Sequence, residues 1–178
     1  MSTYVITGGT TGIGAATRKL LLSQGHEVFN IDFKGGDYLA DLSAPQGRQG
    51  AIDEVFRRYP DGIDVLICNA GVGPTAPPQI IFALNFFASV KIAEALRPLL
   101  KKKKGNCVVT SSNSITNMTV RMDWVDMLSN VMDEERVAGI CKGHSPYPGR
   151  ILLQLLQACP GAVGPPGFTV MGSGRTAY

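Results

Sequence analysis

Short apolar runs alternate with longer amphipathic segments along the first 112 residues of the chain. The runs are rich in β-branched residues and too short for helices, which predicts strands; they are Thr3–Thr7, Glu27–Asp32, Asp64–Asn69 and Cys107–Ser111. Between them, apolar residues recur at helical spacing, which predicts helices over Gly14–Gln24, Pro45–Tyr59 and Gln79–Leu100. Strands separated by helices imply an α/β fold, a doubly wound parallel sheet with helices on both faces.

The pattern changes in the last part of the chain. Asp133, Glu134 and Glu135 form an acidic stretch typical of a first helical turn, in a helix that runs to Cys141. After Tyr147 the chain is rich in Gly and Pro, and the segment GAVGPPGFTVMGSG has neither a helical nor a strand period. We therefore expect one folded domain over residues 1–148 and a poorly ordered tail over residues 149–178.

Composition narrows the class of protein. The 178 residues are 44% hydrophobic and 17% charged, which is typical of a globular domain, and a net charge of +3 argues against a nucleic-acid partner. The sequence has neither a run of about 18 apolar residues nor a secretion signal, so we expect a cytoplasmic protein without a membrane span. The four cysteines are widely spaced, which favours free thiols and no metal site. Lys101–Lys104 resembles a nuclear signal only in isolation, because cations are favourable at a helix C-terminus.

The segment TGGTTGIGAA lies between the first predicted strand and the first predicted helix. Backbone N–H groups at such a turn, together with the helix dipole, favour a pyrophosphate. Gly8 allows a tight turn, Gly12 a close backbone approach to the ligand, and Gly14 close packing of helix on strand. The candidate ligand-binding residues of this turn are Gly8, Thr10, Thr11, Gly12, Ile13 and Gly14. The alternative is a glycine-rich turn that holds no ligand.

Three polar positions further along the chain favour the ligand. Asp32 ends the second strand, where a carboxylate accepts hydrogen bonds from both hydroxyls of an adenosine ribose and repels a 2′-phosphate, which predicts NAD over NADP. Asp41 and Leu42 follow at a place where an adenine ring fits. Asn69, Ala70 and Gly71 close the third strand at the carboxyl edge of the sheet. In this order, the features predict a Rossmann-type dinucleotide-binding domain.

With these motifs the chain resembles the short-chain dehydrogenase/reductase family. The family motif T-G-x-x-x-G-x-G matches Thr7–Gly14, its N-A-G matches Asn69–Gly71, its helix asparagine matches Asn85, and its strand-ending serine matches Ser112. The segments GIGAATRKLL, GHEVFNIDF and ADLS resemble more narrowly the bacterial 3α-hydroxysteroid dehydrogenase/carbonyl reductase branch.

The resemblance implies an NAD-dependent oxidoreductase that acts on a small alcohol or ketone of hydroxysteroid type, usually as a homo-oligomer. In the family a tyrosine exchanges a proton with the substrate oxygen, and a lysine four residues later lowers the pKa of that tyrosine. By the same mapping Ser112 positions the substrate and Asn85 supports a water chain to the lysine.

The chain departs from the family after Ser112, because none of its five tyrosines is followed four residues later by lysine. Read one nucleotide forward, codons for Leu153 and Gln157 can encode a tyrosine and a lysine at the family spacing. We therefore infer a frameshift between about residues 147 and 153, either real or an error of assembly, or a truncation. Three consequences are expected: a fold incomplete at its C-terminal side and lacking the family's interface helix, Cys107–Ser111 as an exposed sheet edge, and an inactive chain. A non-catalytic dinucleotide-binding domain and a product without function are the alternatives.

Overall fold

A parallel sheet forms the centre of the computed structural model, which describes residues 1–111, 133–142 and 168–172. In this part of the chain the strand order is β3-β2-β1-β4-β5-β6, and each neighbouring pair is parallel. The strands are β1 (Thr3–Thr7), β2 (Glu27–Asp32), β3 (Tyr38–Leu39), β4 (Val65–Cys68), β5 (Asn106–Ser111) and β6 (Phe168–Gly172). The predicted doubly wound α/β fold is confirmed.

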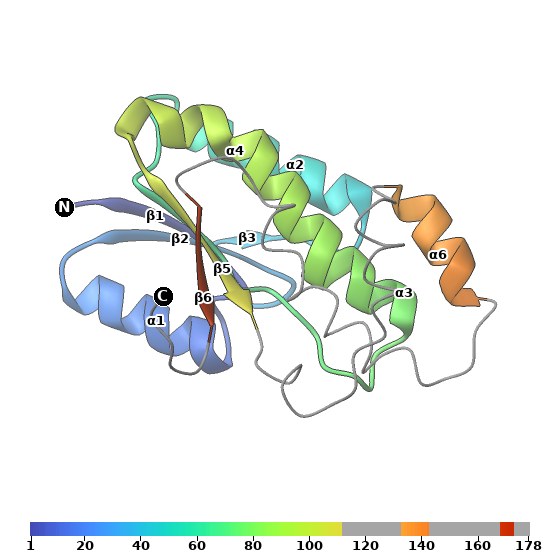
Figure 1. The fold of residues 1–178 in the computed structure, drawn as a ribbon. Coiled ribbons are helices and arrows are strands. Elements are labelled where there is room, and N and C mark those ends of the chain that lie inside the picture. Colours follow the sequence, from blue (N-terminus) through green and yellow to red (C-terminus); the bar gives the residue numbers. More distant parts are fainter. Residues whose placement is uncertain (112–132, 143–167, 173–178) are drawn as a thin grey trace.

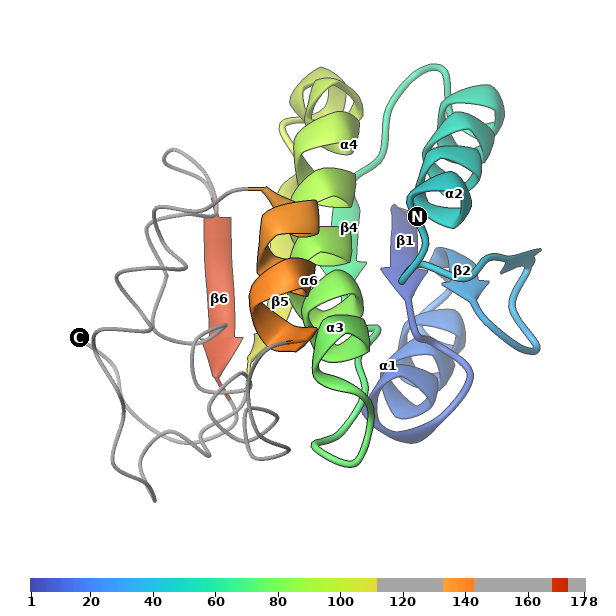
Figure 2. The same cartoon turned by 90° about the vertical axis from the view of Figure 1, so that its right-hand side faces the viewer.

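Helices lie on both faces of this sheet (Figure 1). The first face carries α1 (Gly12–Ser23), and the second carries α2 (Pro45–Arg58) and α4 (Ser89–Lys103). A continuous helical run leads into α4, made of α3 (Pro78–Ile81) and the π-helical turn η1 (Phe82–Ala88). A further helix, α6 (Glu134–Lys142), packs against α3 and η1 on the outside of this layer (Figure 2).

The hydrophobic core fills the space between the sheet, α2 and α4. Buried side chains reach it from β1, β2, β4 and β5 and from one face each of α2 and α4; the largest side chains of this core are Phe29, Ile31, Ile63, Leu66, Ile92, Leu96 and Leu99. On the opposite face Gly14 is the buried residue of α1, and Leu20 and Leu22 of that helix are exposed. Burial is therefore concentrated on the α2–α4 side.

Most predicted elements are confirmed with small changes at their ends. Strand Glu27–Asp32 has the predicted bounds, whereas α1 starts at Gly12 instead of Gly14. The long predicted helix runs from Pro78 to Lys103 and is long and apolar enough to span a membrane by length and composition alone. Half of its most apolar stretch is buried inside the protein, which is typical of a core helix.

One prediction is wrong at the C-terminal edge of the sheet. Cys107–Ser111 was expected to be an exposed edge, but β6 pairs with β5 in parallel from Cys107↔Phe168 to Ser111↔Gly172. The sequence FTVMG shows no clear alternation of polar and apolar residues, so periodicity alone does not predict a strand there. The glycines and prolines that flank FTVMG could have indicated a short strand between them.

Candidate functional site

The glycine turn joins β1 to α1 and is held by close backbone contacts. Gly8 has a φ of +71°, and a Cβ there would lie 2.7 Å from the Cα of Ala70. A Cβ on Gly14 would lie 2.0 Å from the carbonyl oxygen of Gly8, closer than any real contact. These two glycines therefore let the turn, the start of α1 and the chain after β4 approach one another, as the sequence predicts for a tight turn and close helix packing.

Gly12 differs from the other two because space surrounds it. Its φ is +55°, and a Cβ built on it would meet no atom within 4 Å among the described residues. No described side chain caps the N-terminus of α1, where Thr11 is the N-cap residue. The start of α1 therefore lines the cleft without a side-chain cap, and a helix N-terminus of this kind accepts an anion.

Thr7, Asn69 and Thr110 bind the ends of three neighbouring strands together. The Thr7 hydroxyl is buried and accepts hydrogen bonds of 3.1 Å from the N–H groups of Asn69 and Ala70. The Asn69 amide donates to the carbonyl of Gly8 at 2.9 Å, and its Oδ1 accepts from the Thr110 hydroxyl at 3.1 Å. The amide of Asn69 therefore fixes the glycine turn relative to β4 and β5.

A second set of contacts holds the other side of the turn. The fully buried Asn30 accepts a hydrogen bond from the N–H of Gly9 at 2.8 Å and donates to the Thr10 hydroxyl at 3.1 Å. Asp32, at the end of β2, accepts from the N–H of Thr10 at 3.0 Å through Oδ2. Its other oxygen, Oδ1, has only a long contact of 3.4 Å with the N–H of Lys34 and is left for a further donor.

These elements surround a cleft of about 780 Å³ at the carboxyl ends of the strands. A volume in this range is typical of small-molecule and cofactor sites. The cleft is lined by Gly8, Thr11, Gly12, Ile13, Asp32, Phe33, Ala40, Asp41, Leu42, Ser43, Asn69, Ala70, Gly71, Val72, Ile80, Leu84 and Thr110. Two of the residues predicted to bind the cofactor are outside this lining: Gly14 is buried in α1, and Thr10 faces a smaller hollow of about 260 Å³.

The two predicted catalytic residues have different positions. Asn85 lies in η1, and its side chain pairs with both main-chain groups of Val72, accepting from the N–H at 2.9 Å and donating to the carbonyl at 3.0 Å. This pairing holds Val72 in the cleft wall. Ser112 lies outside the described residues. The roles of both residues in catalysis stay predictions.

Two dehydrogenases share part of the sequence. The chain is 42% identical over 103 residues to 3-alpha-hydroxysteroid dehydrogenase/carbonyl reductase of Comamonas testosteroni, covering 57% of this chain and 40% of the relative. It is 34% identical over 115 residues to coniferyl-alcohol dehydrogenase of a Pseudomonas species, covering 61% of this chain and 43% of the relative. The chain thus matches less than half the length of these relatives.

A solved structure carries the likeness over nearly the whole chain. The 3-alpha-hydroxysteroid dehydrogenase from Pseudomonas sp. B-0831, complexed with NADH, matches with a TM-score of 0.75 and 28% identity over 96% of this chain and 70% of that one. The sequence relatives and the solved structure point to the short-chain dehydrogenase/reductase family. No family model matches it. Salutaridine reductase from Papaver somniferum, with a TM-score of 0.69 and 17% identity, agrees in fold.

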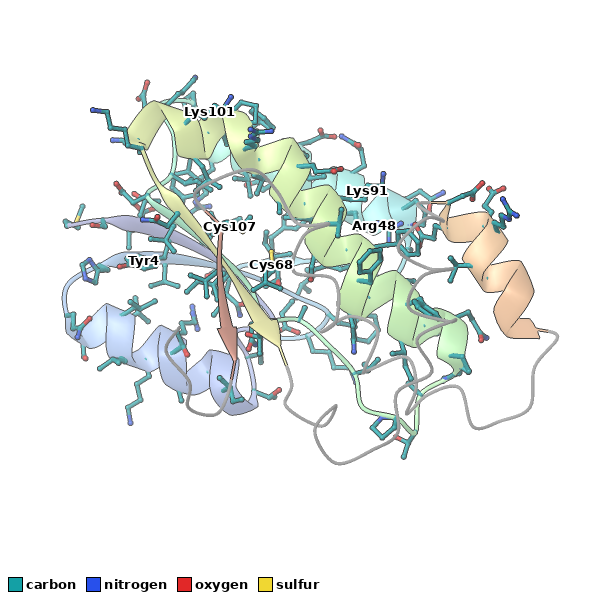
Figure 3. The ribbon with its side chains drawn as sticks, in the orientation of Figure 1. Tyr4, Arg48, Cys68, Lys91, Lys101 and Cys107 are labelled. Carbon is teal, nitrogen blue, oxygen red and sulfur yellow. The ribbon has the colours of Figure 1, made fainter. Side chains whose placement is uncertain are left out.

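Two cysteines, Cys68 on β4 and Cys107 on β5, lie in the hydrophobic core (Figure 3). Cys68 and Cys107 are buried free thiols, as the sequence predicts. A hydrogen-bonding contact with Cys107 and the burial of the side chain hold the pKa of the Cys68 thiol well above its usual range. Cys68 is therefore a structural residue with little thiolate character. Cys159 lies outside the described residues.

The sequence-based prediction missed the residues that support the cleft from behind. Asn30 interrupts the apolar strand EVFNID, and a polar residue at such a place indicates a specific partner. Arg48 occupies the apolar stripe of α2, at helical spacing from the buried Ala51, Ile52 and Val55. A charged residue in a buried stripe was the signal that could have identified it.

Proposed function

We propose that the cleft of this chain binds NAD(H). The observation that carries the proposal is the position of Asp32 beside the glycine turn in the cleft wall, with Oδ2 bonded to the turn and Oδ1 in a long contact of 3.4 Å with the N–H of Lys34. The pyrophosphate is proposed to lie against Gly12 and Ile13, the adenosine ribose against Asp32, and the adenine beside Asp41 and Leu42. These residues fit a dinucleotide because Gly12 presents no side chain to the ligand.

Asp32 further supports a preference for NAD over NADP. A carboxylate accepts hydrogen bonds from the two ribose hydroxyls, whereas it repels a 2′-phosphate with a charge of about −1.5 to −2. The side chain is half-buried, so solvent screens this repulsion only in part. The solved relative from Pseudomonas sp. B-0831 is a complex with NADH, which agrees with this preference.

The proposed chemistry is the oxidation of an alcohol or the reduction of a ketone. The nicotinamide supplies the hydride chemistry when bound, and the protein must orient the substrate and handle its proton. Ser112 is the proposed residue for holding the substrate oxygen, and Asn85 keeps the loop at Val72 in place. A hydroxysteroid-like substrate is proposed because two of the similar dehydrogenases carry that name.

We further propose that the 178-residue chain binds NADH without turnover. Its sequence contains no Tyr-x-x-x-Lys, so Ser112 lacks a group to exchange the proton with the substrate oxygen. The cofactor-binding residues all precede Asn85 in the chain and are independent of that motif. A non-catalytic dinucleotide-binding domain is the alternative function that the same cleft supports.

Titration of the purified chain with NADH, followed by fluorescence or calorimetry, tests the cofactor part of the proposal. An Asp53→Asn variant serves as a control, because Asp53 is an exposed carboxylate on α2 that bonds only Gln49. Turnover is then measured with NAD and a 3α-hydroxysteroid, and with NADH and a bulky ketone. Saturable NADH binding without turnover supports the proposal. Measurable turnover contradicts the inactivity, and no binding at millimolar NADH contradicts the function as a whole.

A further inference from the structure

Arg48 is a buried arginine that connects three separate segments of the chain (Figure 3). Its Nη1 donates to the carbonyl oxygens of Leu42 at 3.3 Å, Ser43 at 3.5 Å and Ala83 at 3.1 Å. Its Nη2 donates to Oε2 of Glu134 in the first turn of α6. The side chain of Arg48 is 5% exposed and that of Glu134 is 27% exposed, so solvent screens this ion pair only partly.

The segments joined by Arg48 form or support two walls of the cleft. Leu42 and Ser43 line it directly, and Ala83 precedes Leu84, which lines it together with Ile80 of α3. Helix α6 packs against α3 and η1 from outside, and Val137 of α6 is buried there. Arg48 therefore connects the α6 helix to the wall at which the adenine is proposed to bind.

The helix α6 has its own start signal, and the ion pair with Arg48 adds a contact to its packing on α3 and η1. Asp133 caps the helix by accepting hydrogen bonds from the N–H groups of Glu135 at 3.0 Å and Arg136 at 3.1 Å. A cap stabilises helical structure without fixing where the helix lies. Among the described contacts of α6, the charged pair Glu134–Arg48 joins α6 to the Leu42–Ser43 loop.

We propose that Arg48 is a positioning residue that couples the docking of α6 to cofactor binding. The proposal rests on the proposed function of the cleft. When Glu134 holds the guanidinium, Arg48 keeps the carbonyls of Leu42 and Ala83 at a fixed separation, and the cleft has the shape that the adenine half requires. When α6 undocks from α3 and η1, the guanidinium of Arg48 loses its anionic partner and is free to shift toward water. Coupling is reciprocal, so cofactor binding also stabilises the docked α6.

Two substitutions test the coupling. Glu134→Gln keeps the size of the side chain and removes its charge, and Arg48→Lys keeps the charge but loses the fork of donors that reaches several acceptors at once. The control is Glu54→Gln, which breaks the exposed pair with Arg57 on the same helix. Each full-length variant is titrated with NADH and with AMP, and amide hydrogen exchange of residues 134–142 is measured with and without saturating NADH.

We expect Glu134→Gln to raise the dissociation constants of NADH and of AMP to a similar extent, by about tenfold, which is about 1.4 kcal/mol. Glu54→Gln is expected to bind both like the parent chain. In the parent chain NADH slows exchange of residues 134–142 more than that of residues 99–103, which lie at the far end of α4. This difference is expected to vanish in Glu134→Gln, whereas a purely structural role of the pair would lower stability and leave the difference in place.

The outcomes separate this proposal from the proposed function. If the parent chain binds no NADH, both proposals fail. If it binds NADH, and Glu134→Gln binds equally well with unchanged protection of α6, only the coupling is overturned. Arg48→Lys gives a second measurement beside Arg48→Met, a variant that removes the charge. If positive charge at this site positions the loop, Arg48→Lys is expected to bind NADH more tightly than Arg48→Met but less tightly than the parent chain.

Discussion

Replacement of Asp32 by asparagine should change the choice between NADH and NADPH. Asparagine keeps an oxygen that accepts the 3.0 Å hydrogen bond from the N–H of Thr10, so the turn retains its support. At about 5 Å, each unit of phosphate charge interacts with the carboxylate by about 0.8 kcal/mol in water and about 3 kcal/mol at an effective dielectric constant near 20. Since Asp32 is half-buried, we take about 2 kcal/mol as the repulsion that the substitution removes.

NADH binding should weaken at the same time. The ribose hydroxyls lose a charged acceptor, and hydrogen bonds to charged groups exceed neutral ones by about 1 kcal/mol. The ratio of the NADPH and NADH dissociation constants should therefore fall by about a hundredfold, since each tenfold step is about 1.4 kcal/mol. Fluorescence titration of the parent chain, Asp32→Asn and the surface control Asp53→Asn measures this ratio. A ratio that stays within threefold of the parent value would refute the placement of the ribose at Asp32.

Two further substitutions test the glycine turn and the core. Gly14→Ala places a Cβ 2.0 Å from the carbonyl oxygen of Gly8 and should abolish NADH binding and lower the melting temperature. Gly12→Ala meets open space and should lower the free energy of unfolding by about 1–2 kcal/mol, because its φ is +55°. Thermal melts and NADH titrations compare the two variants, and equal effects would contradict the packing argument. Burial, followed by the hydrogen bond with Glu27, raises the pKa of Tyr59 from 10.0 to about 12. A raised pKa gives stability that is complete below pH 10 and is lost between pH 10 and 12, so urea unfolding should show a loss of about 2–3 kcal/mol over this range that Tyr59→Phe lacks.

Local sequence patterns predicted the first strands and the glycine turn well, because each of these features is determined by residues close together in the sequence. The run EVFNID and the spacing of Gly8, Gly12 and Gly14 each report on a single strand or turn. Asp32 follows directly from the end of β2, and parallel strands bring such ends to one edge. Helix α1 begins earlier than predicted. Glycine has a low helix propensity, which argues for a later start, but the packing of Gly14 on Gly8 favours the helical turn here.

The features that were missed depend on contacts between distant residues. Glu134 lies 86 residues from Arg48, so no spacing rule connects them. The π-helical turn η1 has the same apolar residues as an ordinary helix, and the hydrogen bonds of Asn85 to Val72 tie it to a loop 13 residues earlier in the chain. The strand β6 gains its partner only when the fold has brought β5 beside it. Periodicity reports none of these contacts, because it describes one segment at a time.

The proposed cofactor binding is therefore separable from the proposed catalysis for a structural reason. The turn is held by side chains in or just after β1, β2 and β4: the Asn30 amide oxygen accepts from the N–H of Gly9, the Asn69 amide donates to the carbonyl of Gly8, and the Thr7 hydroxyl accepts from the N–H of Asn69. None of these contacts involves a residue beyond Thr110, so the hydrogen bonds described here hold the glycine turn without the later chain. Arg48 is different, because one of its four acceptors is Glu134. A change in the later part of the chain should thus reach the cofactor at its adenine end first.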